Sequence, residues 1–213
     1  TRKPLYFASG LLAGSVAAVI AYKLFHHVRV RVLAWKTPLK VIDNEGYQIC
    51  QSLFAIGTGG FFGLGLYQGM PNKIPVVEQD FIFAAISEEL GGMFALCLIL
   101  VCVSCFLMFL NIAMQLKDSF YKLVALGLGT IYGFQVFLTI GGVTKFIPST
   151  GVTLPLVSYG GSSMLSTLII FGIIQGLYIL REDEGVSHHE KGQHKSAKKK
   201  AKSGFETEVR DLS

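Results

Sequence analysis

Residues 90–116 read LGGMFALCLILVCVSCFLMFLNIAMQL and contain no charged side chain. A helix needs about 20 mostly apolar residues to cross the hydrocarbon core of a bilayer, and this stretch is longer than that. A soluble fold of this size has no interior large enough to keep several such stretches out of water. The stretch therefore predicts a transmembrane helix and indicates a membrane protein.

The rest of the chain extends this prediction. Of 213 residues, 51% are hydrophobic and only 15% charged, whereas soluble domains have about 25% charged residues. Six of the 33 charged side chains lie between residues 81 and 180. Three further apolar stretches are long enough to be spans, at residues 4–25, 123–147 and 163–180. We expect an all-α polytopic membrane protein with about four transmembrane helices, not a soluble enzyme, a disordered chain or a secreted disulfide scaffold.

Lysine and arginine near the span ends predict the orientation, because short basic loops stay on the cytoplasmic side. The tail 181–213 is basic, with six lysines between Lys191 and Lys202, and we expect it to be cytoplasmic rather than to bind nucleic acid. The short turn 117–122 has the same charge and the same predicted side. The loop 146–162 and the residues around Asp80 are then extracellular.

The segment 46–66, GYQICQSLFAIGTGGFFGLGL, is uncharged but rich in glycine. If it spans the membrane, Arg29 and Arg31 are cytoplasmic, as the charge rule prefers. If it re-enters the membrane or lies on its surface, residues 26–80 form one long outer loop. Glycine costs about 1 kcal/mol in a helix interior, and broken backbone survives at membrane depth only where protein or a wet cavity covers it. The residues alone leave both alternatives open.

The first candidate site is PNKIPVVEQDFIFAAISEELGG, residues 71–92, since ionisable groups at a membrane interface are functional candidates. Asp80 is predicted either to cap the following helix or to take a proton from a substrate hydroxyl, which needs a partly desolvated carboxylate. Helical spacing puts Glu88 and Ser87 on the face of Asp80, so Glu88 is a second candidate. Glu89 is expected to be exposed at the interface.

The second candidate site is PSTGVTLPLVSYGGSS, residues 148–163, with seven hydroxyl groups in 16 residues. Hydroxyls and free backbone N–H groups bind anions, above all where a helix begins; the alternative is a plain turn. There is no nucleotide-binding motif, serine–histidine–aspartate set or metal-ligand spacing. The candidate substrate-binding residues here are Ser149, Thr150, Thr153, Ser158, Tyr159, Gly160, Gly161 and Ser162.

Together these motifs resemble the FtsW/RodA/SpoVE (SEDS) family of bacterial cell-wall synthesis. The resemblance rests on DFIFAAISEELG at residues 80–91, on residues 148–163, and on 46–66, which is similar to the segment before the family's catalytic loop. It implies the last four of ten spans, with the others upstream of Thr1. Ser87 replaces a usual glycine and Lys145 stands at a usually uncharged position, so division, elongation and sporulation subtypes stay open.

The resemblance implies a peptidoglycan glycosyltransferase of the bacterial cytoplasmic membrane. Such enzymes polymerise lipid II, a disaccharide-peptide on undecaprenyl pyrophosphate, at the outer face, beside a class B penicillin-binding protein that acts as transpeptidase. It gives Asp80 the role of essential general base. Basic side chains, together with a divalent cation (Mg or Mn) if one is bound, would stabilise the pyrophosphate. The alternative is that they contact anionic lipid headgroups. These side chains are Lys73, Arg29, Arg31 and Lys145.

The resemblance also favours re-entry for the segment 46–66. The expected organisation is a transmembrane helix (1–25), an extracellular catalytic loop (26–80), three transmembrane helices (81–180) with an extracellular loop (146–162), and a basic cytoplasmic tail (181–213). Two alternative functions remain: a lipid II translocator, which needs no base at Asp80, and a non-catalytic membrane scaffold for a transpeptidase.

Overall fold

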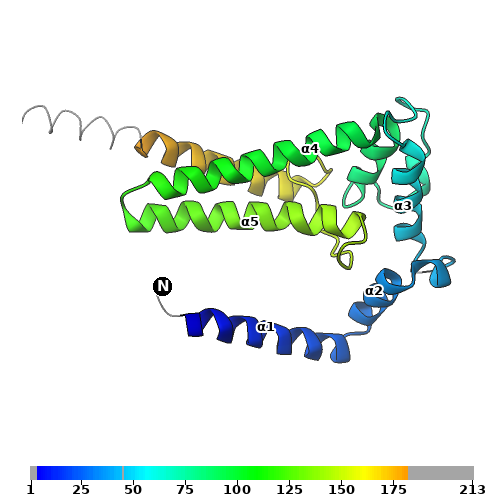
Figure 1. The fold of residues 1–213 in the computed structure, drawn as a ribbon, viewed down its shortest axis with the longest axis horizontal. Helices are drawn as coiled ribbons and strands as arrows, with labels where there is room; N and C mark the ends of the chain where they lie inside the picture. Colours follow the sequence, from blue (N-terminus) through cyan, green and yellow to red (C-terminus); the bar gives the residue numbers. More distant parts are fainter. Residues whose placement is uncertain (1–3, 45, 182–213) are drawn as a thin grey trace, which may run out of the picture. The chain divides into compact units, whose positions relative to one another are not determined.

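The computed structural model describes residues 4–44 and 46–181, and in these ranges it contains helices and loops but no β-strand. The predicted all-α class is therefore confirmed. Three helices are long and apolar enough to cross a membrane, and Figure 1 shows them in chain order: α4 (Ile82–Gln115), α5 (Ser119–Val143) and a last helix, Gly161–Arg181. The predicted tail lies outside the described residues from position 182 onward.

A fourth candidate span is bent. Helix α1 (Pro4–Leu24) meets α2 (His26–Lys36) at Phe25, whose extended backbone (φ −101°, ψ 117°) ends the first helix. The axes of Ala8–Leu24 and His26–Lys36 differ by 99°, a turn visible in Figure 1. The predicted first span, residues 4–25, thus corresponds in extent to α1, and its crossing of the membrane stays a prediction. The basic residues after it continue as a second, sharply turned helix.

The segment 46–66 does not form a spanning helix. It contains α3 (Tyr47–Gly59), which has 13 residues and is therefore only about 20 Å long. Gly60 ends it with a positive φ of 54°, a conformation that favours glycine. An irregular loop then leads to the short helix η2 (Pro71–Lys73). Residues 46–66 therefore do not form one continuous transmembrane helix, and their placement relative to the bilayer stays a prediction.

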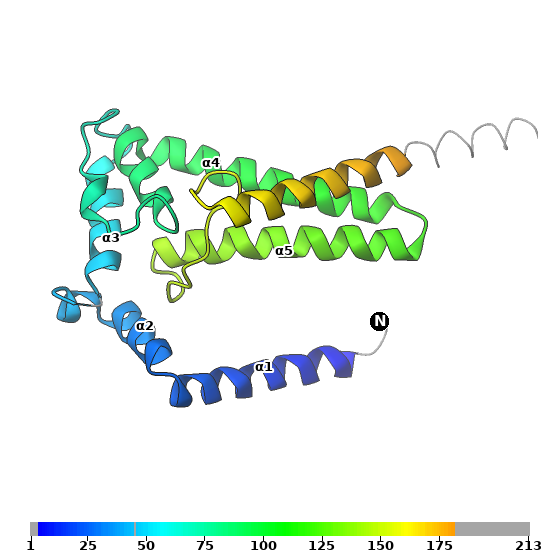
Figure 2. The same cartoon turned by 180° about the vertical axis from the view of Figure 1, so that it is seen from behind.

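Helix α4 begins eight residues before the predicted span and is broken at Gly91 (φ 86°, ψ 168°). The loop after α3 fills the break: Leu64 N donates to Glu88 O (3.0 Å) and Gly92 N donates to Gly60 O (2.9 Å). Figure 2 shows this loop beside the start of α4. A side chain at Gly91 would meet the backbone of the loop, so glycine is required both for its φ and for the close approach.

The chain divides into two compact units. One, Ser104–Ile131 with Leu165–Ser213, contains the antiparallel ends of α4 and α5 and most of the last helix, and Phe109 packs edge-on against Phe171 in it (5.0 Å between ring centroids).

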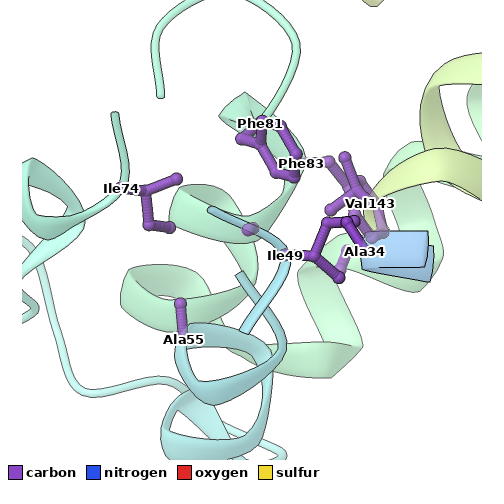
Figure 3. Close-up of a cluster of buried hydrophobic side chains, with 9 residues drawn as sticks. Ala34, Ile49, Ala55, Ile74, Phe81, Phe83 and Val143 are labelled. Carbon is purple, nitrogen blue, oxygen red and sulfur yellow. The ribbon is translucent and has the colours of Figure 1, made fainter. Parts of the chain in front are cut away.

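The other unit, Thr1–Val103 with Tyr132–Met164, holds both candidate sites. Its core joins α2, α3, the loop before α4, the first part of α4 and the end of α5. Figure 3 shows most of this cluster, which consists of Ala34, Ile49, Ala55, Ile74, Phe81, Phe83, Ala84, Ala95 and Val143.

Candidate functional site

Asp80 is held by the residue that follows it. Phe81 is 1% exposed and lies in the core drawn in Figure 3, where burial of a phenylalanine side chain contributes about 2 kcal/mol. The carbonyl of Phe81 accepts the bond from Ala84 N (2.9 Å) that starts α4, so Phe81 is the N-cap residue. The alternative in which Asp80 caps α4 is therefore wrong, and its half-buried carboxylate is left for another role.

Two distant parts of the sequence lie at the Asp80 carboxylate. A Cβ atom built on Gly151 would lie 3.8 Å from Asp80 Oδ2 and 3.7 Å from Arg31 Nη2. Gly151 has a positive φ of 72°, which favours glycine, and its missing side chain leaves room beside the carboxylate and the guanidinium. Both charged groups thus lie within 4 Å of the position that a side chain of residue 151 would occupy.

The surroundings of Asp80 shift its titration. Burial raises the pKa of Asp80 above its ordinary value, while its own backbone N–H and the Arg31 guanidinium lower it in part. Desolvation disfavours the charged form of a carboxylate. The shift is toward the neutral range in which a general base works best.

The loop 148–163 is fastened around this carboxylate at two points. Arg31 Nη1 donates to the carbonyl of Ser149 (3.2 Å), and the backbone N–H of Tyr159 donates to the carbonyl of Glu78 (2.8 Å). Residues from α2, from the turn before α4 and from the loop after α5 therefore meet at Asp80. The structure brings the two sequence motifs together in this way.

Several hydroxyls of the second motif brace their own loop. Thr153 Oγ1 donates to Ser163 Oγ (2.7 Å), and Ser158 Oγ accepts from Leu154 N (2.8 Å). The backbone N–H of Tyr159 is bound, but its side chain is 74% exposed. Thr150, Gly161 and Ser162 are also exposed, and Gly160 is partly so. The predicted contacts of this loop with substrate stay predictions. The exposed residues are more accessible to a substrate than those whose hydroxyls are hydrogen-bonded within the loop.

Of the four predicted basic side chains, Arg31 is the one whose charge acts on Asp80. Arg29 donates to the carbonyl of Lys23 (3.0 Å), back toward α1. Lys145 lies close enough to Cys50 to interact with it electrostatically. Lys73 is exposed on η2.

Glu88 occupies a different environment from Asp80. Its side chain is 7% exposed, Oε1 accepts from Met70 N (3.2 Å), and buried Oε2 has no partner among the described residues. Gly69 lies against it: a Cβ there would be 3.0 Å from Glu88 Cδ. Glu88 therefore fastens the loop before η2 to α4. The expected common face with Asp80 does not arise, because Asp80 precedes the helix.

Three polar side chains help to position the site, although the sequence analysis did not propose them as site residues. Gln135 Nε2, in α5, donates to Thr153 O (3.0 Å); Trp35 Nε1, in α2, donates to Lys145 O (3.0 Å); Gln48 Nε2, in α3, donates to Pro75 O (2.7 Å). Only Gln135 carried a signal, as an amide inside an otherwise apolar span, where polar groups bond across to other segments.

The described residues offer little to a metal ion. No three acidic, histidine or cysteine side chains group together in ranges 4–44 and 46–181, and Mg²⁺ or Mn²⁺ is held mainly by carboxylate and other oxygen ligands. Asp80 supplies a single carboxylate beside Gly151, which by itself does not make a metal centre.

Comparison with known proteins gives one consistent answer. Residues 3–182 match the family model FTSW_RODA_SPOVE, described as cell cycle protein. The chain is 41% identical over 174 residues to the protein named peptidoglycan glycosyltransferase RodA of Mycobacterium tuberculosis, which covers 82% of this chain and 37% of the relative.

Two further relatives carry other names from the same group. A probable peptidoglycan glycosyltransferase FtsW of Geobacter metallireducens is 38% identical over 68% of this chain and 40% of its own length. Stage V sporulation protein E of Bacillus subtilis is 40% identical over 66% of this chain and 38% of its own length. The chain thus spans about two fifths of the length of these relatives.

Proposed function

This chain belongs to the FtsW/RodA/SpoVE family, and from that premise we propose that it carries the catalytic base of a peptidoglycan glycosyltransferase. The substrate is lipid II, which the whole protein polymerises into glycan strands at the outer face of the cytoplasmic membrane. Two of the three relatives compared above are named as peptidoglycan glycosyltransferases. Those names support the reaction class.

In the proposed step the hydroxyl of the acceptor sugar attacks the anomeric carbon of the donor. Asp80 accepts the hydroxyl proton as the new glycosidic bond forms, and the bond to undecaprenyl pyrophosphate breaks. Arg31, which adjoins Gly151 together with Asp80, stabilises the negative charge on the departing pyrophosphate. Lys73, which is exposed on η2, is a second candidate for that charge.

One observation carries the proposal. A half-buried carboxylate with a raised pKa lies near a guanidinium, and both groups adjoin a glycine whose missing side chain leaves room beside them. A helix cap needs neither the cation nor the space, and Asp80 does not cap α4. A base that works beside an anionic leaving group needs both.

The arrangement in the membrane is part of the same proposal. Residues 26–80 and 146–162 lie on the extracellular side, and the tail from residue 181 lies in the cytoplasm. A class B penicillin-binding protein acts beside the enzyme as transpeptidase. The basic turn 117–122 between α4 and α5 supports this orientation, because short basic loops stay cytoplasmic.

The test is lipid II polymerisation by the full-length protein with its transpeptidase, comparing wild type with Asp80→Asn. We expect polymer formation to fall by about 10²–10⁴-fold, the usual contribution of a general base, while lipid II binding persists. Glu78→Gln, two residues away and exposed, is the matched control and should keep full activity. Unchanged polymerisation by Asp80→Asn would remove the base assignment, and lipid II transport across vesicles without polymer would favour a translocator.

The same variant has an expected effect on stability. Because burial raises the pKa of Asp80 in the folded state, this carboxyl group favours folding most at pH values below its ordinary pKa. That contribution is lost as the pH rises through the folded-state pKa. At neutral pH, Asp80→Asn should therefore unfold at the same temperature as wild type or a higher one, so lost activity would not reflect misfolding.

A further inference from the structure

The loop between α3 and α4 exposes large apolar side chains. Phe62 is 81% exposed and Tyr67 is 96% exposed, and the sequence from residue 46 to residue 72 holds no charged side chain. Exposed apolar patches of this kind mark sites of contact with protein, ligand or membrane. We call these side chains the apolar loop patch: Phe61, Phe62, Leu66, Tyr67 and Met70.

The backbone of this loop is satisfied by α4. Besides the two bonds already described, Gly65 N donates to Glu89 O (2.9 Å) and Met93 N donates to Phe61 O (3.2 Å). Irregular backbone is tolerated at membrane depth where protein groups satisfy its polar atoms. The break in α4 at Gly91 exposes the carbonyls and N–H groups that make these bonds.

The length of α4 places the patch near the membrane boundary. After the break, residues 92–115 form 24 residues of helix, about 36 Å at 1.5 Å per residue. The hydrocarbon core is about 30 Å thick, and charged residues follow at Lys117 and Asp118. The first turn after Gly91 therefore reaches the opposite interface. Phe61, whose carbonyl is bonded to Met93, lies at this depth.

The two sides of the loop differ in residue size. Gly59 and Gly63 face α4 so closely that a Cβ on either would collide with its backbone, whereas the patch side chains are exposed. Contacts between membrane helices are rich in small residues, so the glycine side has the character of a protein contact. Met93 and Phe94 of α4 are exposed as well, and Met93 is bonded to Phe61 of the patch. Aromatic side chains are enriched at membrane interfaces.

We infer that the apolar loop patch inserts into the lipid bilayer at the boundary between acyl chains and headgroups, so that its occupant is membrane lipid. The loop then anchors the segment leading to Asp80 at a fixed depth. This inference depends on the loop and on α4 alone and stands whether or not the glycosyltransferase proposal holds.

Site-specific photocrosslinking in native membranes tests it. The full-length protein would carry p-benzoylphenylalanine in place of Phe62 or Tyr67, both of which are exposed aromatic residues. Position 100, an exposed leucine in the middle of α4, is the positive control, and position 40, an exposed lysine, is the negative one. We expect a mass increase of one phospholipid at positions 62, 67 and 100, several-fold more abundant than at position 40.

Two outcomes would overturn the inference. One is a crosslink from position 62 or 67 to another part of the protein, or to a second protein such as a transpeptidase. The other is the absence of lipid adducts at both positions while position 100 gives one. Correct folding of each variant is checked by thermal unfolding of the purified full-length protein, which substitutions on an exposed patch should leave close to that of wild type.

Discussion

Replacing Arg31 by glutamine should change the pH dependence of the enzyme. The guanidinium lowers the pKa of Asp80, so its removal raises that pKa further and leaves less of the base ionised in mild acid. The acid side of the profile of kcat/KM, which reports the base in the free enzyme, should therefore move to higher pH in Arg31→Gln.

The magnitude follows from the geometry. Nη2 of Arg31 and Oδ2 of Asp80 lie 3.7 and 3.8 Å from the same point beside Gly151, so they are at most about 7.5 Å apart. Because Arg31 is exposed, an effective dielectric constant of roughly 40–80 is appropriate. At this upper bound the interaction is about 0.6–1.1 kcal/mol, and a shorter separation makes it larger. In mild acid, the rate relative to its own plateau should fall about three- to sixfold.

The assay is initial-rate lipid II polymerisation across a pH series, with each variant scaled to its plateau. The scaling separates the effect on the base from any loss of pyrophosphate binding, which lowers the plateau as well. Arg29→Gln is the matched control, because this arginine lies on the same helix but donates to Lys23. Its pH profile should match that of wild type.

An Arg31→Gln profile that matches wild type after scaling would show that the guanidinium does not act on the catalytic base. A profile displaced to lower pH would contradict the sign of the argument outright. Arg31→Lys should restore most of the wild-type profile, since it keeps a positive charge near the carboxylate. Failure of that rescue, with Arg31→Gln displaced as expected, would point to the bond with Ser149 rather than to charge.

Three further substitutions test packing around the site. Gly151→Ala must hold alanine in a left-handed conformation, costs about 1–2 kcal/mol and should lower polymerisation more than stability, as measured by activity and thermal unfolding. In Gly63→Ala the new methyl group has no room beside the backbone of α4, and the substitution should cost roughly 2–3 kcal/mol of unfolding free energy. Gly57→Ala, whose methyl group would meet no other atom, is the control for Gly151→Ala and Gly63→Ala. A loss of stability in Gly57→Ala equal to theirs would contradict the packing argument. Glu88→Gln keeps an acceptor for the backbone N–H and neutralises a buried oxygen that has no partner, so thermal unfolding should occur at an equal or higher temperature, whereas a loss of stability beyond that of Glu89→Gln would indicate a cationic partner for this carboxylate.

Much of the fold was accessible from the sequence. Uncharged stretches of 18 or more residues are rare outside membranes, so residues 90–116 alone indicated the class. The motifs at residues 80–91 and 148–163 were long enough to indicate the family, which the comparison confirmed. The segment 46–66 was ambiguous because glycine weakens a helix without excluding one, and only the bonds it makes with α4 resolved its shape.

The composition of the site was predictable, but its assembly was not. Asp80 stood out because a carboxylate beside an apolar run is costly unless it has a function. Arg29 and Arg31 were equivalent candidates in the sequence. The fold separates them, because Arg31 acts on Asp80 and donates to Ser149 whereas Arg29 donates back to Lys23. Likewise, nothing distinguished Gly151 among the 24 glycines of the chain, whereas the fold places it beside two charged groups.

The sequence by itself therefore determined that the chain folds in a membrane, where its long apolar helices lie and which residue types are available for catalysis. These features depend on local hydrophobicity and on motifs contiguous in the chain. The tertiary structure decided the break of α4 at Gly91, the burial of Glu88 and the meeting of Arg31, Asp80 and Gly151. Each of these depends on contacts between residues far apart in the sequence. Such contacts are set by packing across the whole unit, for which no local pattern carries a signal.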